Sequence, residues 1–127
     1  LAVLRRLKLD GTLLGVDVVY RKRLVAKDAN ESALLRFLES GKVKIVITLI
    51  GGQGILFGRG NQQISPKVLK HVRPENVIVI ATLEKIHSMA GNPLFVDTGD
   101  PAVDRMFQGY IRIITGYQDQ IVYRVTG

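Results

Sequence analysis

Two apolar runs rich in β-branched residues constrain the fold more than any other feature of this sequence. Residues 43–50 read VKIVITLI and residues 77–81 read VIVIA. Such nearly unbroken runs are typical of strands buried on both faces. A helix is expected between them, because Ser65 is a suitable N-cap, Pro66 suits the first helical position and Pro74 ends the pattern. Strand, helix and strand in this order predict a right-handed crossover unit with two parallel strands.

The same alternation of strands and helices extends in both directions along the chain. Before the two runs, the sequence predicts an antiparallel hairpin over residues 12–27 and a helix between Asn30 and Gly41. After them it predicts a helix from Thr82 to Met89, a strand at residues 94–96, a helix between Asp100 and Gly109, and a hairpin of residues 110–115 and 120–125. We therefore expect residues 1–127 to form a single α/β domain with a mostly parallel sheet, flanking helices and antiparallel hairpins at both ends.

Composition removes several classes of function. The chain has no cysteine, which excludes a disulfide framework and thiolate metal ligands and favours a reducing, cytoplasmic setting. Its two histidines, His71 and His87, are too few for a zinc centre, and no nucleophile pattern accompanies them. No apolar run approaches the roughly 20 residues that span a membrane, and no leader segment opens the sequence. We expect no metal site and no membrane association.

The net charge of +7 favours an anionic partner such as a nucleotide, a polyphosphate or a nucleic acid. Nucleic-acid binding requires the basic residues to converge on one face, but they are scattered except at residues 21–23. An ordinary basic surface is the alternative. A nucleotide is the ligand that we expect.

Residues 51–63, GGQGILFGRGNQQ, are the first candidate binding segment. They lie between a predicted strand and a capped helix, and glycine at this density lets backbone amides close on a phosphate. Neither the P-loop nor the dinucleotide fingerprint is satisfied. The alternative is a tightly turned connection whose glycines have only a steric role. The candidate nucleotide-binding residues are Gly51, Gly52, Gln53, Gly54, Gly58, Arg59, Gly60, Asn61 and Gln62.

A second candidate lies at the end of the strand predicted at residues 94–96. Asp97 and Thr98 could receive ribose hydroxyls, and two carboxylates with a hydroxyl could also bind Mg²⁺. Asp100 has a competing role as the cap of the following helix. Thr82, Glu84 and Lys85 follow another strand and could also touch a ligand, but helix capping and the helix dipole explain Thr82 and Glu84 equally well.

The sequence resembles a known family in six segments: GTLLGVDVV, KDANE, GGQGILFGRGNQQISP, VIVIAT, PLFVDTGDPAVDR and GYIRIITGY. These resemble the C-terminal half of bacterial ATP-NAD kinase-family proteins (inorganic polyphosphate/ATP-NAD kinase-like), in the branch that includes acetoin-catabolism proteins. The resemblance extends from about Asp10 to the end of the chain. The Gly-rich segment and VDTGDP, in this order and separated by an α/β unit, are more specific together than either is alone.

The resemblance implies a two-domain kinase with ATP and NAD as substrates, Mg²⁺ as a further cofactor, and a role in NADP biosynthesis. An N-terminal domain with a GGDG motif would supply the catalytic aspartate, and this half would help to hold the dinucleotide. Gln53 stands where that acid would be, and an amide cannot act as a general base. The catalytic residues are therefore left unassigned. The Ser/Thr-rich loop of ordinary NAD kinases is missing, so the phosphoryl acceptor could be another nucleotide or a small metabolite.

We therefore expect the chain to be the C-terminal nucleotide-binding half of an ATP-dependent NAD kinase-like phosphotransferase, a transferase fragment that is inactive alone. Its expected partners are a nucleotide, the N-terminal domain and further copies of itself in a homo-oligomer. The alternative is a noncatalytic nucleotide-sensing or oligomerisation module.

Overall fold

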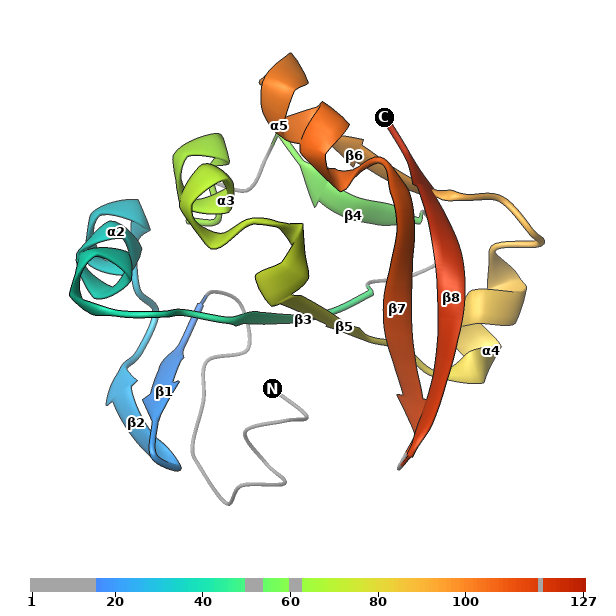
Figure 1. The fold of residues 1–127 in the computed structure, drawn as a ribbon. Coiled ribbons are helices and arrows are strands. Elements are labelled where there is room, and N and C mark those ends of the chain that lie inside the picture. Colours follow the sequence, from blue (N-terminus) through green and yellow to red (C-terminus); the bar gives the residue numbers. More distant parts are fainter. Residues whose placement is uncertain (1–15, 50–53, 60–62, 117) are drawn as a thin grey trace.

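The computed structural model describes residues 16–49, 54–59, 63–116 and 118–127. Within them the chain forms a two-stranded sheet, a six-stranded sheet, four α-helices and one 3₁₀ helix (Figure 1). The strands are β1 (Val18–Tyr20), β2 (Arg23–Ala26), β3 (Ile45–Thr48), β4 (Ile55–Gly58), β5 (Val77–Ile80), β6 (Leu94–Asp97), β7 (Gly109–Gly116) and β8 (Asp119–Thr126). The helices are α2 (Glu31–Ser40), α3 (Pro66–Val72), η1 (Pro74–Asn76), α4 (Leu83–Ser88) and α5 (Pro101–Phe107).

The six-stranded sheet consists of two parallel arms joined by an antiparallel hairpin. Its strand order is β3-β5-β7-β8-β6-β4, and only β7 and β8 pair antiparallel. The chain alternates between the arms, so β3, β5 and β7 form one arm and β4, β6 and β8 form the other. This mostly parallel α/β sheet, with hairpins at both ends of the chain, confirms the predicted fold class. The first residues of the predicted N-terminal hairpin, 12–15, lie outside the described residues.

The strand β4 was not predicted. The sequence indicated one connection over residues 51–63, but Ile55–Gly58 form a strand that pairs parallel with β6 at the edge of the sheet opposite β3. Leu56 and Phe57 of this strand are buried, and the ring of Phe57 packs edge-on against Phe107 at 5.3 Å between centroids. Burial of these two side chains, Phe57 against Phe107 of α5, stabilises a strand that the surrounding glycines made hard to predict.

The prediction that residues 43–50 form a strand buried on both faces is wrong. The strand β3 lies at an edge of the sheet, and its residues alternate between half-buried and exposed. Val46 is 45% exposed, whereas Ile78, which lies opposite it in the neighbouring β5, is half-buried. Apolar character alone does not distinguish a doubly covered strand from an edge strand whose outer residues are also apolar.

The helices begin at the residues that the sequence indicated. Side-chain oxygens of Asn30, Ser65, Thr82 and Asp100 accept hydrogen bonds from backbone amides in the first turns of α2, α3, α4 and α5. Figure 1 shows α2, α3 and α5 side by side, in agreement with the contacts between α2 and α3 and between α3 and α5. The most deeply buried side chains belong to α3, α5 and one face of the sheet: Val68, Leu69, Val72, Val79, Leu94, Val96, Val103 and Ile113.

None of the helices in the described parts of the chain is long and apolar enough to cross a membrane.

Candidate functional site

The strand β4 divides the Gly-rich segment into two pieces. Gly54 precedes β4 and Arg59 follows it, and four residues of strand extend over about 13 Å. Gly54 and Arg59 are therefore held apart, at opposite ends of this strand. Six of the candidate residues lie outside the described residues: Gly51, Gly52, Gln53, Gly60, Asn61 and Gln62.

Gly54 has a structural role at the first end of β4. It is buried, its φ is +68°, and its carbonyl oxygen accepts a hydrogen bond of 2.8 Å from the amide of Phe95. A Cβ atom at this position would lie 3.5 Å from Sδ of Met89. A side chain would fit the space, but the left-handed backbone would remain strained.

The other end of β4 brings together two candidates that are far apart in the sequence. Nε of Arg59 donates a hydrogen bond of 3.0 Å to Oδ1 of Asp97, across 38 residues of sequence. The strands place them there, because Gly58 is opposite Asp97 in the register of β4 and β6. The side chains of Arg59 and Asp97 are 72% and 40% exposed. An ion pair this exposed contributes at most about 1 kcal/mol to stability, so both groups remain available to a ligand.

Thr98, the candidate next to Asp97, makes hydrogen bonds within the protein. It is buried, and its hydroxyl donates a hydrogen bond of 2.7 Å to Oδ1 of Asp104. The same oxygen accepts the Thr98 amide at 2.8 Å. Thr98 therefore fixes the turn between β6 and α5. Sequence reasoning missed Asp104, although an acidic residue in the first turn of a helix is a recognisable signal.

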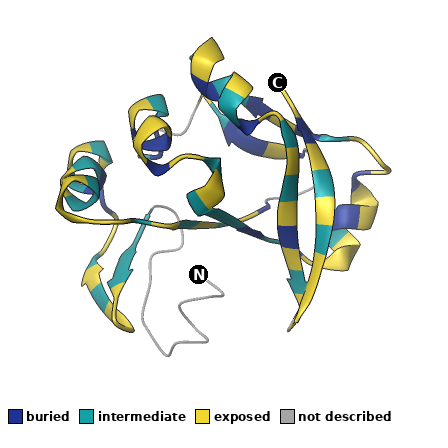
Figure 2. Ribbon diagram, viewed as in Figure 1, coloured by how far each residue is buried: buried dark blue, intermediate teal, exposed yellow. Residues whose placement is uncertain are grey.

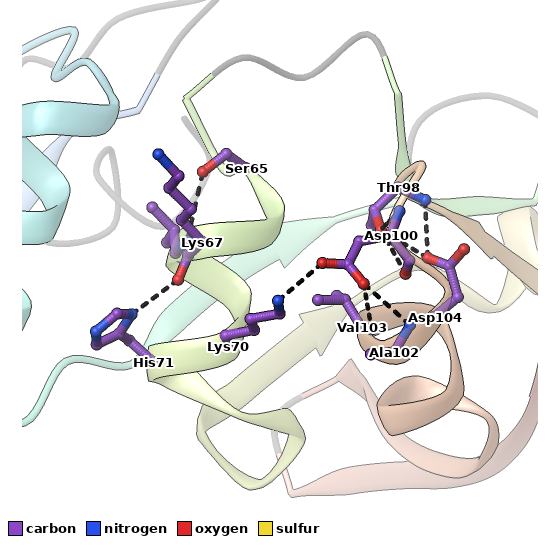
Figure 3. Close-up of polar contacts among 10 residues, drawn as sticks. Ser65, Lys67, Lys70, His71, Thr98, Asp100, Ala102, Val103 and Asp104 are labelled. Carbon is purple, nitrogen blue, oxygen red and sulfur yellow. Dashed lines mark hydrogen bonds and ion pairs between the residues drawn. The ribbon is translucent and has the colours of Figure 1, made fainter.

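Asp100 caps α5 and also joins it to α3 (Figure 3). Its Oδ1 accepts from the amide of Ala102 at 3.0 Å, and its Oδ2 lies 2.9 Å from Nζ of Lys70. The hydrogen bond from Lys70, together with those from the helix amides, holds the pKa of Asp100 below its usual value despite partial desolvation. Both oxygens are engaged within the protein. The capping role expected for Asp100 is confirmed, and Lys70 is a site neighbour that only the structure reveals.

The carboxyl end of β3 is organised by α4 instead. Nζ of Lys85 donates a hydrogen bond of 2.7 Å to the carbonyl oxygen of Leu49, the residue after β3. Thr82 caps the helix by accepting from the Lys85 amide at 3.2 Å. The amino group of Lys85 therefore holds the backbone at this end, and Thr82 caps α4.

The histidines form no catalytic or metal-binding constellation in the described structure. Both side chains are exposed, and Nδ1 of His71 donates to the carbonyl oxygen of Lys67 at 2.9 Å. Within the described ranges, no group of three or more His, Asp or Glu side chains could hold a metal ion.

A model of the ATP-NAD kinase C-terminal domain family matches residues 2–125. No curated protein and no solved structure matches the chain. The family match does not separate the acetoin-catabolism branch from other members. It covers almost the whole chain, including both pieces of the Gly-rich segment and the turn after β6 where Asp97 meets Arg59. The chain therefore belongs to the ATP-NAD kinase C-terminal domain family.

Proposed function

We propose that this domain is the nucleotide-binding half of an ATP-dependent NAD kinase-like phosphotransferase, and that the ligand binds at the carboxyl ends of β4 and β6. The family implies ATP and NAD as substrates. The observation that carries the proposal is the exposed pair of Arg59 and Asp97, 3.0 Å apart at the ends of two adjacent parallel strands. Ligands of open α/β sheets bind beyond such strand ends.

The two side chains offer complementary chemistry. The guanidinium of Arg59 can bind a phosphate through two parallel N–H···O bonds. A carboxylate such as Asp97 accepts hydrogen bonds from ribose hydroxyls. A bound phosphate would compete with Asp97 for Arg59 and leave the carboxylate free to accept from the sugar. Glycines 58 and 60, on either side of Arg59, suit a close approach of backbone to ligand.

We assign the catalytic base to an N-terminal domain with the GGDG motif. The described carboxylates near this end are engaged: Asp97 with Arg59, Asp100 with Lys70 and Asp104 with Thr98. Mg²⁺ would arrive on the phosphates of ATP, as is usual when few protein carboxylates are available. The domain alone is then expected to bind nucleotide without transferring phosphate. A chain without cysteine suits a cytoplasmic kinase.

Calorimetric titration with NAD, NADP and Mg²⁺-ATP tests the proposal. We expect Arg59→Ala to weaken binding of at least one nucleotide by about tenfold, equivalent to about 1.4 kcal/mol. Asp97→Asn should weaken NAD more than ATP if it receives a ribose hydroxyl of the dinucleotide. Gly54→Val is unsuitable as a binding probe, because its backbone strain would disturb folding.

The chain supplies a control in Arg73, whose Nε lies 3.0 Å from Oε1 of Glu75 in another exposed ion pair. Arg73→Ala should leave affinity unchanged. Equal losses in Arg59→Ala and Arg73→Ala would contradict the assigned site. If the wild-type chain binds no nucleotide, the alternative of a noncatalytic oligomerisation module gains support.

A further inference from the structure

The hairpin of β1 and β2 ends in a turn that concentrates positive charge. Tyr20, Arg21, Lys22 and Arg23 are exposed, and we call these four residues the basic tip. No other part of the sequence places three basic residues in succession. The hairpin is a two-stranded sheet of its own, and its turn lies at the lower left of Figure 1, away from α2. Figure 2 shows the turn in the colour of exposed residues.

The backbone of the turn is strained. The register pairs Tyr20 with Arg23, so Arg21 and Lys22 are the two central residues of the turn. Their φ angles are +49° and +63°. Two-residue hairpin turns of this kind need the left-handed conformation, which Asn-Gly adopts most readily and which a larger side chain makes unfavourable. Strained residues cluster at functional sites, where a second demand outweighs stability.

The charges of the basic tip also oppose folding. Among the residues that the structure describes, no carboxylate forms an ion pair with a basic side chain of the tip. Three like charges in succession repel one another. The one printed contact of these side chains is within the tip, where Cζ of Arg21 lies 5.3 Å from the centroid of the Tyr20 ring. A bound anion would relieve the repulsion, so the composition of the turn suits binding better than folding.

The aromatic ring indicates which kind of anion fits. The side chain of Tyr20 is 61% exposed, and it shares one face of the hairpin with Arg23, its direct partner in the register. Proteins that bind single-stranded nucleic acid combine cations along the phosphate backbone with exposed aromatic rings on which bases stack. An acidic peptide would use the charges but would leave the ring without a base. The net charge of +7 attracts a polyanion over longer distances.

We propose that the basic tip binds single-stranded nucleic acid, with phosphates at its three basic side chains and a base stacked on the ring of Tyr20. This site is separate from the proposed nucleotide site, which lies at the ends of β4 and β6 in the other sheet. Three phosphate contacts on a single strand predict a slope of about −2 for the logarithm of the association constant against that of the salt concentration. Affinity should then fall about twentyfold between about 50 mM and about 200 mM salt.

The test is a double variant, Arg21→Asn with Lys22→Gly, which gives the turn the residues that it favours. We expect the melting temperature to rise, because the strain and the repulsion are removed, and binding to be lost. The affinity for a fluorescein-labelled oligothymidine of about 12 nucleotides should fall at least about tenfold at low salt, and the slope should change to about −0.7. Fluorescence anisotropy measures binding, and melting followed by circular dichroism measures stability. A purely structural role of the tip does not predict opposite changes in stability and affinity.

A charge-matched control removes two exposed basic side chains elsewhere, through Lys67→Gln in α3 with Arg105→Gln in α5. This control should keep the affinity and slope of the wild type, whereas Tyr20→Ala should weaken binding about fivefold through loss of one stacked base. Equal losses in the turn variant and the control would overturn the proposal, because they would show attraction by net charge alone. It would also be overturned by absence of oligothymidine binding at low salt, or by equally tight binding of polyglutamate of the same charge.

Discussion

The carboxyl ends of the two arms of the sheet differ in what their side chains do. After β4 and β6, Arg59 and Asp97 form an exposed ion pair, next to the partly buried hydrogen bonds of Thr98 to Asp104. After β3, the amino group of Lys85 instead binds a backbone carbonyl oxygen. The ends of β4 and β6 therefore expose charged groups to the solvent. At the end of β3, the charged group is hydrogen-bonded to the backbone. The strand ends of one sheet are not equivalent as binding sites, because the neighbouring elements decide which groups stay available.

The substitution with the largest expected effect tests whether the two arms of the sheet unfold as one cooperative unit. Leu94 of β6 is completely buried, so Leu94→Ala should lower the free energy of unfolding by about 2–5 kcal/mol. We expect one urea transition with an unchanged slope, monitored by circular dichroism and tyrosine fluorescence. Val79→Ala in β5 is the counterpart in the other arm. Separate transitions for the two probes would show that the arms unfold independently.

The next prediction compares the stability of glycine substitutions at the two ends of β4. Gly54→Ala should cost about 1–2 kcal/mol of stability, because alanine at a φ of +68° adopts a left-handed backbone. Gly58→Ala should be close to neutral in stability, since its Cβ would meet Ile55 Cγ2 at 3.4 Å. Thermal or urea unfolding of both variants measures the difference. Equal losses would show that the left-handed conformation at Gly54 is not what requires glycine.

An effect of similar size tests the turn next to the Arg59–Asp97 pair. Thr98→Val keeps the side-chain shape but removes the hydroxyl that binds Asp104, and it should destabilise the domain by about 1–2 kcal/mol. Nucleotide affinity should fall as well, because the turn after β6 orients Asp97. The control is Thr48→Val in β3, where the threonine is exposed. A stable Thr98→Val variant with full affinity would separate this turn from the site.

The smallest effect concerns the pH dependence of the β6–α5 end. The folded-state pKa of Asp100 is lowered, chiefly by Lys70, so the carboxylate stabilises the fold at neutral pH. This contribution should be lost as the pH falls from the usual aspartate pKa of about 3.9 through the lower folded value. Asp100→Asn should reduce the loss of stability in that acid range, while asparagine still caps α5. Urea unfolding at pH 7 and at pH 3 gives the free energy of unfolding of the variant and of the wild type. An equal loss between the two pH values in both proteins would contradict the assigned contact with Lys70.

Much of the fold is visible in local sequence patterns. The starts of α2, α3, α4 and α5 could be predicted because a cap binds an amide two or three residues further along the chain. The parallel pairing of β3 with β5 also followed from two apolar runs separated by a helix. The site was visible in part, since Arg59 and Asp97 were both candidates, but Lys70 and Asp104 were missed.

The sequence by itself determined the helix boundaries, the hairpins and the alternation of strands with helices, because these depend on residues a few positions apart. Only the tertiary structure decided that Ile55–Gly58 form a strand at the far edge of the sheet, which divides the Gly-rich segment. It also decided that Arg59 meets Asp97 and that Val46 is exposed. The physical reason is that strand order, edge position and burial depend on contacts between segments distant in sequence, and no local pattern specifies which distant segment will provide them.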